Sequence, residues 1–286
     1  MTRRLGQHFL QNKTVVKKII DAIAPEDGDV IIEIGPGHGE LTGELLRYPV
    51  RVIAIEKDPA LVDFLRKKFQ ITNDKLQINS EPRKENLSEI EIIHGDVLKV
   101  LPELIRNRKL EIGNYKLVGN IPYYLTGFLF RTISGLSMLP KRAVFMIQKE
   151  VALRATATPP HMNLLAASIQ LWAKPKVVMI VGKNDFAPKP KVDSAVILLE
   201  THQPVETPSK QQGYFDTLHA LFGQPRKTIV NNITLAFRSL KKCNKAEKDG
   251  VAERLKQIGV KPNDRPHNLC VEDIKKIGEM LYNYDG

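Results

Sequence analysis

Between residues 29 and 200 the chain alternates short apolar runs, rich in β-branched residues, with segments of helical period. The runs are candidate strands at 30–35, 50–58, 90–96, 115–120, 142–150, 176–181 and 194–200. Segments 40–47 and 59–69 follow the first two runs, and each has a helix-like spacing of apolar residues. Strands that alternate with helices predict an α/β domain with a mostly parallel, doubly wound sheet. Such sheets bind ligands beyond the carboxyl ends of their strands, so functional residues are expected just after these runs.

The pattern changes at two places. Segment 72–89 is polar and has little periodicity, which predicts a surface insertion. Beyond the proline-containing segment 201–212, the apolar residues take a helical spacing over 214–222, 228–240, 251–260 and 271–281. We therefore predict two domains, an α/β domain at 1–205 and a small helical domain at 206–286.

The charge of the chain bears on its partners. Lysine and arginine number 43 against 32 aspartate and glutamate, a formal net charge of +11. A field of this sign attracts phosphate backbones or anionic lipid surfaces, and nucleic acid is the leading candidate. Arg226 and Lys227, at the start of a predicted helix, are candidate contacts for RNA phosphates.

Other classes of site are not indicated. The two cysteines, Cys243 and Cys270, have no metal-ligand or disulfide spacing, so no metal site is expected and a reducing cytoplasm fits. The chain has no run of about 18 apolar residues, so no membrane span is expected. A cytoplasmic monomer is the default expectation.

Three glycines, Gly35, Gly37 and Gly39, lie between the first candidate strand and the following helix. Glycine permits a tight turn there and lets the backbone approach a ligand closely. Glu56 ends the second candidate strand about 21 residues after Gly35, a separation at which a carboxylate accepts hydrogen bonds from a ribose diol. The spacing Gly-Xaa-Gly-Xaa-Gly differs from the Gly-Xaa-Gly-Xaa-Xaa-Gly spacing of loops that bind a pyrophosphate. It favours an adenosine-containing cofactor without phosphates, such as S-adenosylmethionine.

Two further strand ends carry candidate ligand contacts. Asp96 follows the third run and is placed to accept from an adenine amino group, with Val97 against the ring. The fourth run is followed by Asn-Ile-Pro-Tyr at 120–123. The Asn120 side-chain oxygen and a main-chain carbonyl of the rigid Ile121-Pro122 unit are two acceptors for one amino group, and Tyr123 offers a flat face to a base. Two such hydrogen bonds orient the amine lone pair towards a methyl sulfonium, so methyl transfer needs positioning and electrostatics.

The motifs as an ordered set resemble the rRNA adenine N6,N6-dimethyltransferase family over residues 3 to 280. They include "LGQHFLQN", "IEIGPGHGELT", "HGDVLK", "GNIPYYLTG", "FAPKPKVDSAV" and "FGQPRKTIVNNI". The last of these, with "DRPHNLCVEDIKKIG", resembles the small-subunit (KsgA/RsmA) type more than the Erm type, which dimethylates large-subunit rRNA.

The resemblance implies a Rossmann-like S-adenosylmethionine-dependent methyltransferase sheet with a small C-terminal helical domain that binds rRNA. It also implies dimethylation of two adjacent adenosines near the 3′ end of 16S rRNA, on an assembly intermediate of the small ribosomal subunit. The cofactor-binding residues carried over are His8, Leu10, Gly35, Gly37, Glu56, Asp96, Val97 and Asn120. The residues carried over for holding the target adenine are Asn120, Pro122, Tyr123 and Phe186. His8 stands where the family often has asparagine.

Other functions share parts of this pattern. A dehydrogenase has the glycine loop and Glu56 but leaves the Asn-Ile-Pro-Tyr tetrad and the basic charge unexplained. A DNA adenine methyltransferase has a similar tetrad but does not suit the C-terminal motifs. A ribosome assembly factor whose docking does not need methylation would have the same sequence features. Only an experiment can distinguish this function from the enzymatic one.

Overall fold

The computed structural model describes residues 9–10, 12–72, 75–76, 89–107, 114–202, 208–239 and 248–282. The chain divides into two compact units, one formed by Met1–Leu153 with Lys174–Thr201 and the other by Arg154–Ala173 with His202–Gly286. The segment 154–173 lies within the predicted domain 1–205, yet it packs with the C-terminal helices. The domain division at residue 205 itself stays a prediction.

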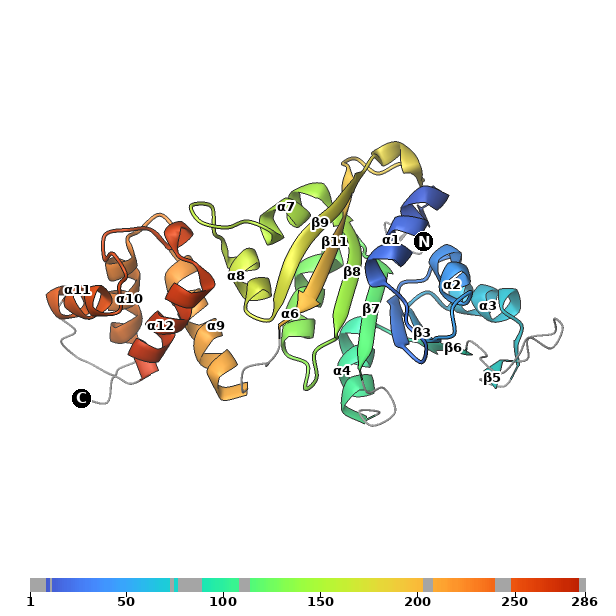
Figure 1. Cartoon of the computed structure of the whole chain (residues 1–286), viewed down its shortest axis with the longest axis horizontal. Helices are drawn as coiled ribbons and strands as arrows, with labels where there is room; N and C mark the ends of the chain where they lie inside the picture. Colours follow the sequence, from blue (N-terminus) through green and yellow to red (C-terminus); the bar gives the residue numbers. More distant parts are fainter. Residues whose placement is uncertain are drawn as a thin grey trace. The chain divides into compact units, whose positions relative to one another are not determined.

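The first unit is built on one seven-stranded sheet with the strand order β6-β3-β2-β7-β8-β11-β9 (Figure 1). β2 is parallel to β3 and β7, β3 to β6, and β7 to β8, whereas β11 is antiparallel to β8. All seven strands overlap the predicted runs, so the Rossmann-like α/β prediction is confirmed. Their bounds are β2 Val30–Ile34, β3 Arg51–Glu56, β6 Glu89–His94, β7 Tyr115–Asn120, β8 Arg142–Gln148, β9 Ala173–Val181 and β11 Ser194–Thr201.

The strand order reverses at β2, which has β3 on one side and β7 on the other. A crevice is expected at such a switch point, beyond the carboxyl ends of the two central strands. Gly119 is opposite Ile34 in this pair, and a Cβ atom at Gly119 would lie 2.5 Å from the Ile34 carbonyl oxygen. Only glycine therefore lets β7 run this close to β2, and the next residue, Asn120, emerges at the crevice.

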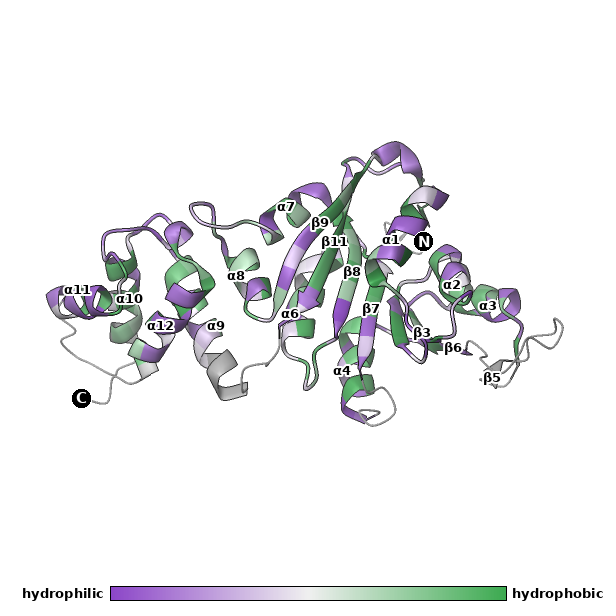
Figure 2. Cartoon of the chain, in the orientation of Figure 1, coloured by the Kyte–Doolittle hydropathy of each residue, from purple (hydrophilic) through white to green (hydrophobic). Residues whose placement is uncertain are grey.

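Helices of the first unit lie on both faces of the sheet and follow the strands as predicted (Figure 1). Asn12 caps α1, and Asp58 caps α3 ahead of Pro59, because each side chain accepts an amide hydrogen from the first helical turn. Hydrophobic residues are frequent along the strands, and the helices carry both hydrophilic and hydrophobic residues (Figure 2). The helices are α1 Lys13–Ile23, α2 Glu40–Leu45, α3 Pro59–Lys68, α4 Val97–Asn107, α6 Thr126–Ser134 and α7 Lys149–Ala155, with 3₁₀ turns η1 Tyr123–Leu125 and η2 Lys183–Asp185.

Two small antiparallel sheets complete this unit. β1 Phe9–Leu10 pairs with β10 Phe186–Ala187, which puts Leu10 opposite Phe186. β4 Ile71–Thr72 pairs with β5 Lys75–Leu76. Most of the predicted insertion at 72–89 lies outside the described residues.

The second unit is helical, as predicted for the C-terminal region. It contains α8 Leu164–Gln170, α9 Pro208–Phe222, α10 Ile229–Ser239, α11 Lys248–Gln257, the 3₁₀ turn η3 Pro266–Asn268 and α12 Val271–Tyr282. The Tyr214 hydroxyl donates to the Ala167 carbonyl at 3.1 Å, which ties α9 to α8. Among the described residues of the chain, no helix is long and apolar enough to cross a bilayer, and no three potential metal ligands cluster.

Candidate functional site

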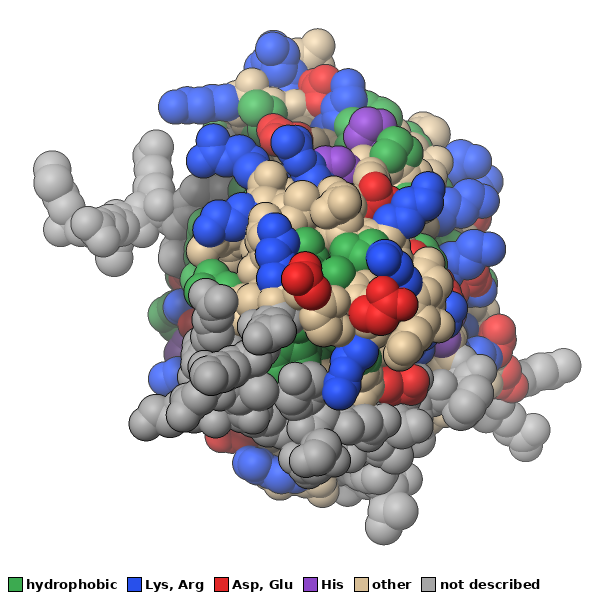
Figure 3. Space-filling model, turned by 90° about the vertical axis from the view of Figure 1, so that its left-hand side faces the viewer, with side chains coloured by type: hydrophobic (Ala, Val, Ile, Leu, Met, Phe, Trp, Pro, Cys, Tyr) green, Lys and Arg blue, Asp and Glu red, His purple; other side chains and the backbone are tan. Residues whose placement is uncertain are grey.

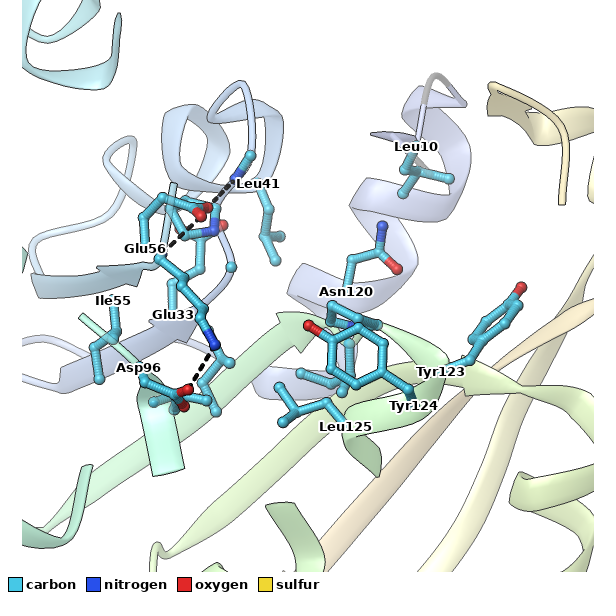
Figure 4. Close-up of a pocket in the computed structure, with 18 of the residues that line it drawn as sticks. Leu10, Glu33, Leu41, Ile55, Glu56, Asp96, Asn120, Tyr123, Tyr124 and Leu125 are labelled. Atoms are coloured by element: carbon cyan, nitrogen blue, oxygen red, sulfur yellow. Dashed lines mark hydrogen bonds and ion pairs between the residues drawn. The ribbon is translucent and has the colours of Figure 1, made fainter. Parts of the chain in front are cut away.

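A pocket of about 310 Å³ opens at the carboxyl ends of the central strands (Figure 4). It gathers residues from segments that are far apart in sequence, including every predicted site residue of the first domain that the structure describes. These are Leu10, Gly35, Gly37, Glu56, Asp96, Val97, Asn120, Pro122, Tyr123 and Phe186. His8 lies outside the described residues, so its predicted contact is not tested.

The glycine loop between β2 and α2 uses left-handed backbone conformations. Gly35 and Gly37 have φ values of 65° and 59°, and Gly39 has φ 79°. At Gly39 a Cβ atom would also meet the Leu65 and Phe69 side chains at 2.9 Å. Gly35 is not crowded, since its Cβ would lie 3.9 Å from the nearest atom, so its glycine is required by the positive φ.

Glu56 ends β3 with its carboxylate held by main-chain amides. Its Oε1 accepts from the amides of Lys57 at 2.7 Å and Asp58 at 2.9 Å. Its Oε2 accepts only a long hydrogen bond, 3.4 Å, from the Gly37 amide. The carboxylate is therefore fixed in direction beside the glycine loop and retains capacity to accept hydrogen bonds from a ligand.

Asp96 forms an ion pair that the sequence did not reveal. Its Oδ2 lies 2.7 Å from the Lys57 ammonium, and its Oδ1 accepts from the Leu98 amide at 3.1 Å, at the start of α4. The hydrogen bond from Lys57 lowers the pKa of Asp96 and raises the pKa of Lys57. Lys57 itself lines the pocket, so its charge there is balanced by a carboxylate.

The tetrad after β7 has a defined backbone. The Ile121 amide donates to the Met146 carbonyl at 3.0 Å, which extends the pairing with β8 past the end of the strand. The Pro122 carbonyl accepts the Leu125 amide at 2.9 Å and closes the turn η1. Of the two carbonyls in the Ile121-Pro122 unit, that of Ile121 is thus the better acceptor for a ligand.

The Tyr123 ring is anchored at its hydroxyl, which lies 2.9 Å from the Ser194 Oγ. Ser194 is buried at the start of β11. Figure 4 shows Tyr123 extending away from the side of the pocket where Glu56 and Asp96 lie. Sequence reasoning missed Ser194 as a functional candidate, and its place inside "PKVDSAV" was the only signal.

Phe186 is buried and still lines the pocket. Its strand, β10, is held by β1, and the Asn12 side-chain amide donates to the Asp185 carboxylate at 2.8 Å. The N-terminal segment and the segment before β11 are thereby joined, with Leu10 and Phe186 both at the pocket.

Glu33 is a further carboxylate that sequence reasoning missed. It is 2% exposed within β2 and accepts from the Thr42 hydroxyl at 2.6 Å. Burial raises the pKa of Glu33 to about 7, against a hydrogen bond from Thr42 that lowers it. The signal was a single acidic residue in the strand "VIIEI", whose residues are all buried.

Arg226 and Lys227 lie in the second unit, in the exposed part, 223–227, of the connection between α9 and α10. They precede α10, which begins at Ile229, so their predicted place at the start of a helix is wrong. The buried Asn232 holds this loop, because its side-chain amide donates to the carbonyls of Leu221 at 3.0 Å and Gln224 at 3.1 Å. Figure 3 shows lysine and arginine side chains spread over the visible face, with acidic side chains more sparsely among them.

Comparison with known proteins gives consistent matches. A family model described as Ribosomal RNA adenine dimethylase matches residues 1–262. A protein named Ribosomal RNA small subunit methyltransferase A from Dehalococcoides mccartyi is 34% identical over 274 residues, 96% of this chain and 86% of that protein. A dimethyladenosine transferase structure from Plasmodium falciparum has a TM-score of 0.76 at 24% identity, covering 97% of this chain and 98% of that one. The 23S rRNA methyltransferase ErmE structure has a TM-score of 0.68 at 21% identity, covering 96% of this chain and all of that one, so both structures share the fold.

Proposed function

Because this chain belongs to the ribosomal RNA adenine dimethylase family, we propose that it methylates N6 of two adjacent adenosines near the 3′ end of small-subunit (16S) rRNA. The enzyme is an S-adenosylmethionine-dependent rRNA adenine N6,N6-dimethyltransferase of the small-subunit type. The Erm type shares the fold, but the small-subunit name is carried by the relatives above 30% identity. The observation that carries the proposal is that Asn120 and Glu56 line the same pocket at the switch point.

The pocket residues fit S-adenosylmethionine better than a dinucleotide. Carboxylates of Glu33, Glu56 and Asp96 line the pocket, and the one lysine among its lining residues is paired with Asp96. Such a lining repels a pyrophosphate and suits a sulfonium cation, which argues against the dehydrogenase alternative. S-adenosylmethionine supplies a methyl group on a positively charged sulfur.

Individual cofactor contacts follow from the geometry. Glu56 would accept the ribose hydroxyls through the capacity left at Oε2, beside the left-handed backbone of Gly35 and Gly37. Asp96 and Val97 would meet the adenine, with Lys57 moving from Asp96 to let its carboxylate accept. Lys57 is more than half exposed, so this exchange disturbs no buried packing. Leu10 would cover the bound cofactor, together with His8.

The target amine is held by acceptors at the end of β7. The Asn120 side-chain oxygen and the Ile121 carbonyl would each accept one N6 hydrogen, while Pro122 fixes the turn. The two oxygens would orient the N6 lone pair and would stabilise the positive charge that the nitrogen gains on methylation. Tyr123 and Phe186 would hold the adenine ring, with the Tyr123 ring fixed by Ser194.

The RNA partner follows from the same chemistry. An adenine inside a pocket has to be unstacked, so the substrate is a loop or a single-stranded segment. Arg226 and Lys227 would contact phosphates from the second unit, and each removed charge would reduce the salt dependence of binding by about one. We propose action by a cytoplasmic monomer on an assembly intermediate of the small subunit.

The test is an assay of the purified enzyme with S-adenosylmethionine and small-subunit particles that lack these methylations. The RNA is digested to nucleosides and analysed by mass spectrometry. The unmutated protein and an Asn184→Ala control, at an exposed asparagine outside the pocket lining, should produce N6,N6-dimethyladenosine. Asn120→Ala should lower the rate at least about 100-fold, because loss of one transition-state hydrogen-bond partner costs about that factor or more.

Other results separate the alternatives. Modification of large-subunit rRNA alone would identify the Erm activity. Particle binding without any methylated adenosine would favour the non-catalytic assembly factor and refute the enzymatic proposal.

A further inference from the structure

The solvent face of η1 and α6 has an unusual composition. Residues 124, 127, 128 and 131 are exposed, and they recur at the spacing of one helical face. A surface helix normally has polar side chains on that face. Here the residues are Tyr124, Gly127, Phe128 and Arg131, which we name the α6 platform.

Tyr124 and Phe128 are 58% and 60% exposed, the highest values among the large hydrophobic side chains of the described residues. Both also line the pocket that contains Asn120. The aromatic pair therefore forms part of the rim of the pocket that holds Asn120. An exposed aromatic pair at the rim of a functional pocket indicates a ligand surface more than a folding requirement.

Gly127 is not explained by the fold. A Cβ atom at this position would meet nothing within 4 Å, and the backbone is not in the left-handed region. Glycine within a helix costs about 0.5 to 1 kcal/mol relative to alanine. The bare backbone between Tyr124 and Phe128 leaves room for another group to approach the helix closely.

Arg131 adds a positive charge to the same face. Its side chain makes no hydrogen bond or ion pair with any residue that the structure describes. A guanidinium in this setting is available for a phosphate group. The α6 platform thus offers stacking surface and an anion contact, the two features that proteins combine to bind single-stranded nucleic acid.

We propose that the α6 platform binds the nucleotide next to the target adenosine, with its base stacked on Phe128 and Tyr124 and its phosphate near Arg131. This inference rests on the proposed function. Two adjacent adenosines are both substrates there, so while one occupies the pocket, its neighbour lies at the pocket rim. A stacked neighbour keeps the RNA in register, and a shift of one nucleotide then exchanges the two adenosines.

The test compares Phe128→Ala, Phe128→Tyr and Arg131→Gln with the unmutated enzyme, using small-subunit particles that lack the methylations. Ile180→Ala is the matched control, at an exposed apolar side chain on β9 that does not line the pocket. The measurements are KM and kcat for the particles, the dissociation constant for S-adenosylmethionine without RNA, and the salt dependence of KM.

Phe128→Ala should lower kcat/KM for particles at least about fivefold, the low end of what stacking of one base supplies. Most of the loss should lie in KM, and S-adenosylmethionine binding should stay within about twofold of the unmutated value. Phe128→Tyr should restore most of the loss, because a tyrosine ring also stacks. Arg131→Gln should reduce the slope of log KM against log salt by about one.

The inference is overturned if Phe128→Ala matches Ile180→Ala in kcat/KM. It is also overturned if S-adenosylmethionine binding falls as much as particle methylation does, since Phe128 would then belong to the cofactor site. Failure of the unmutated enzyme to methylate any adenosine would be a different result, because it refutes the proposed function itself.

Discussion

Replacement of Glu33 by glutamine should stabilise the cofactor-free protein at neutral and alkaline pH. Glu33 is buried in the central strand β2, and burial raises its pKa from 4.5 to about 7. Below pH 4.5 the side chain is protonated in both the folded and the unfolded chain. Between pH 4.5 and 7 the unfolded chain loses this proton and the folded chain keeps it, so the free energy of unfolding falls as pH rises.

The size of this effect follows from the two pKa values. The difference between 7 and 4.5, at about 1.4 kcal/mol for each pH unit, gives about 3.5 kcal/mol. Glutamine carries no charge and can still accept from the Thr42 hydroxyl through its side-chain oxygen. The stability of Glu33→Gln relative to the unmutated protein should therefore grow by about 2 to 3 kcal/mol between pH 5 and pH 8.

Urea unfolding at pH 5, 6, 7 and 8, followed by far-ultraviolet circular dichroism, measures this difference. Tryptophan fluorescence would report on the second unit, because the one tryptophan, Trp172, belongs to it, whereas Glu33 belongs to the first. Far-ultraviolet detection follows the unfolding of both units. Glu44→Gln, at a partly exposed glutamate on α2, is the control and should show little pH-dependent change. A difference between Glu33→Gln and the unmutated protein that stays constant within about 0.5 kcal/mol from pH 5 to pH 8 would refute the reasoning.

Four further substitutions test the geometry of the site. Gly119→Ala should destabilise the protein by about 3 kcal/mol or abolish folding, because its methyl group would lie 2.5 Å from the Ile34 carbonyl oxygen; a loss below about 1 kcal/mol in urea unfolding would contradict this. Gly127→Ala should raise the free energy of unfolding by about 0.5 to 1 kcal/mol and still lower kcat/KM for particles. Higher stability with full activity would show that RNA binding does not need the exposed helix backbone at Gly127. Ser194→Ala should lower kcat about three- to tenfold without weakening S-adenosylmethionine binding. Tyr123→Phe should lower kcat no further when it is combined with Ser194→Ala. Additive losses of kcat in the double variant would mean that the two hydroxyls do not act as a unit.

The strands and their functional ends could be predicted from sequence because both depend on local pattern. The stretches "VII" and "VIAI" within the first two runs are continuously apolar, as expected of parallel strands covered on both faces. Parallel strands end at one edge of their sheet, so residues placed after separate strands, such as Glu56 and Asn120, converge without any knowledge of side-chain contacts. The strand order and the helical C-terminal unit confirmed the Rossmann-like prediction.

The missed features depend on contacts between distant segments, which local periodicity does not encode. The ion pair of Lys57 with Asp96 joins residues 39 positions apart. The hydrogen bond of Tyr123 with Ser194 spans 71 positions. The exposed aromatic pair of the α6 platform was also missed, because in sequence Phe128 is indistinguishable from a core residue of an apolar helix.

Residues 154–173 belong to the second unit although strands of the sheet precede and follow them in the chain. This arrangement limits how the chain can be cut into fragments and the order in which its parts can assemble. The chain leaves the first unit after β8, contributes α8 to the second, and returns to add β9 and β11 to the sheet. A gene fragment cut near residue 205 would therefore encode α8 without α9, and the Ala167 carbonyl would lose its hydrogen bond from the Tyr214 hydroxyl. During synthesis α8 leaves the ribosome before its partner helices exist. The second unit can close only after β9 and β11 have been synthesised, because α9 to α12 follow these strands in the chain.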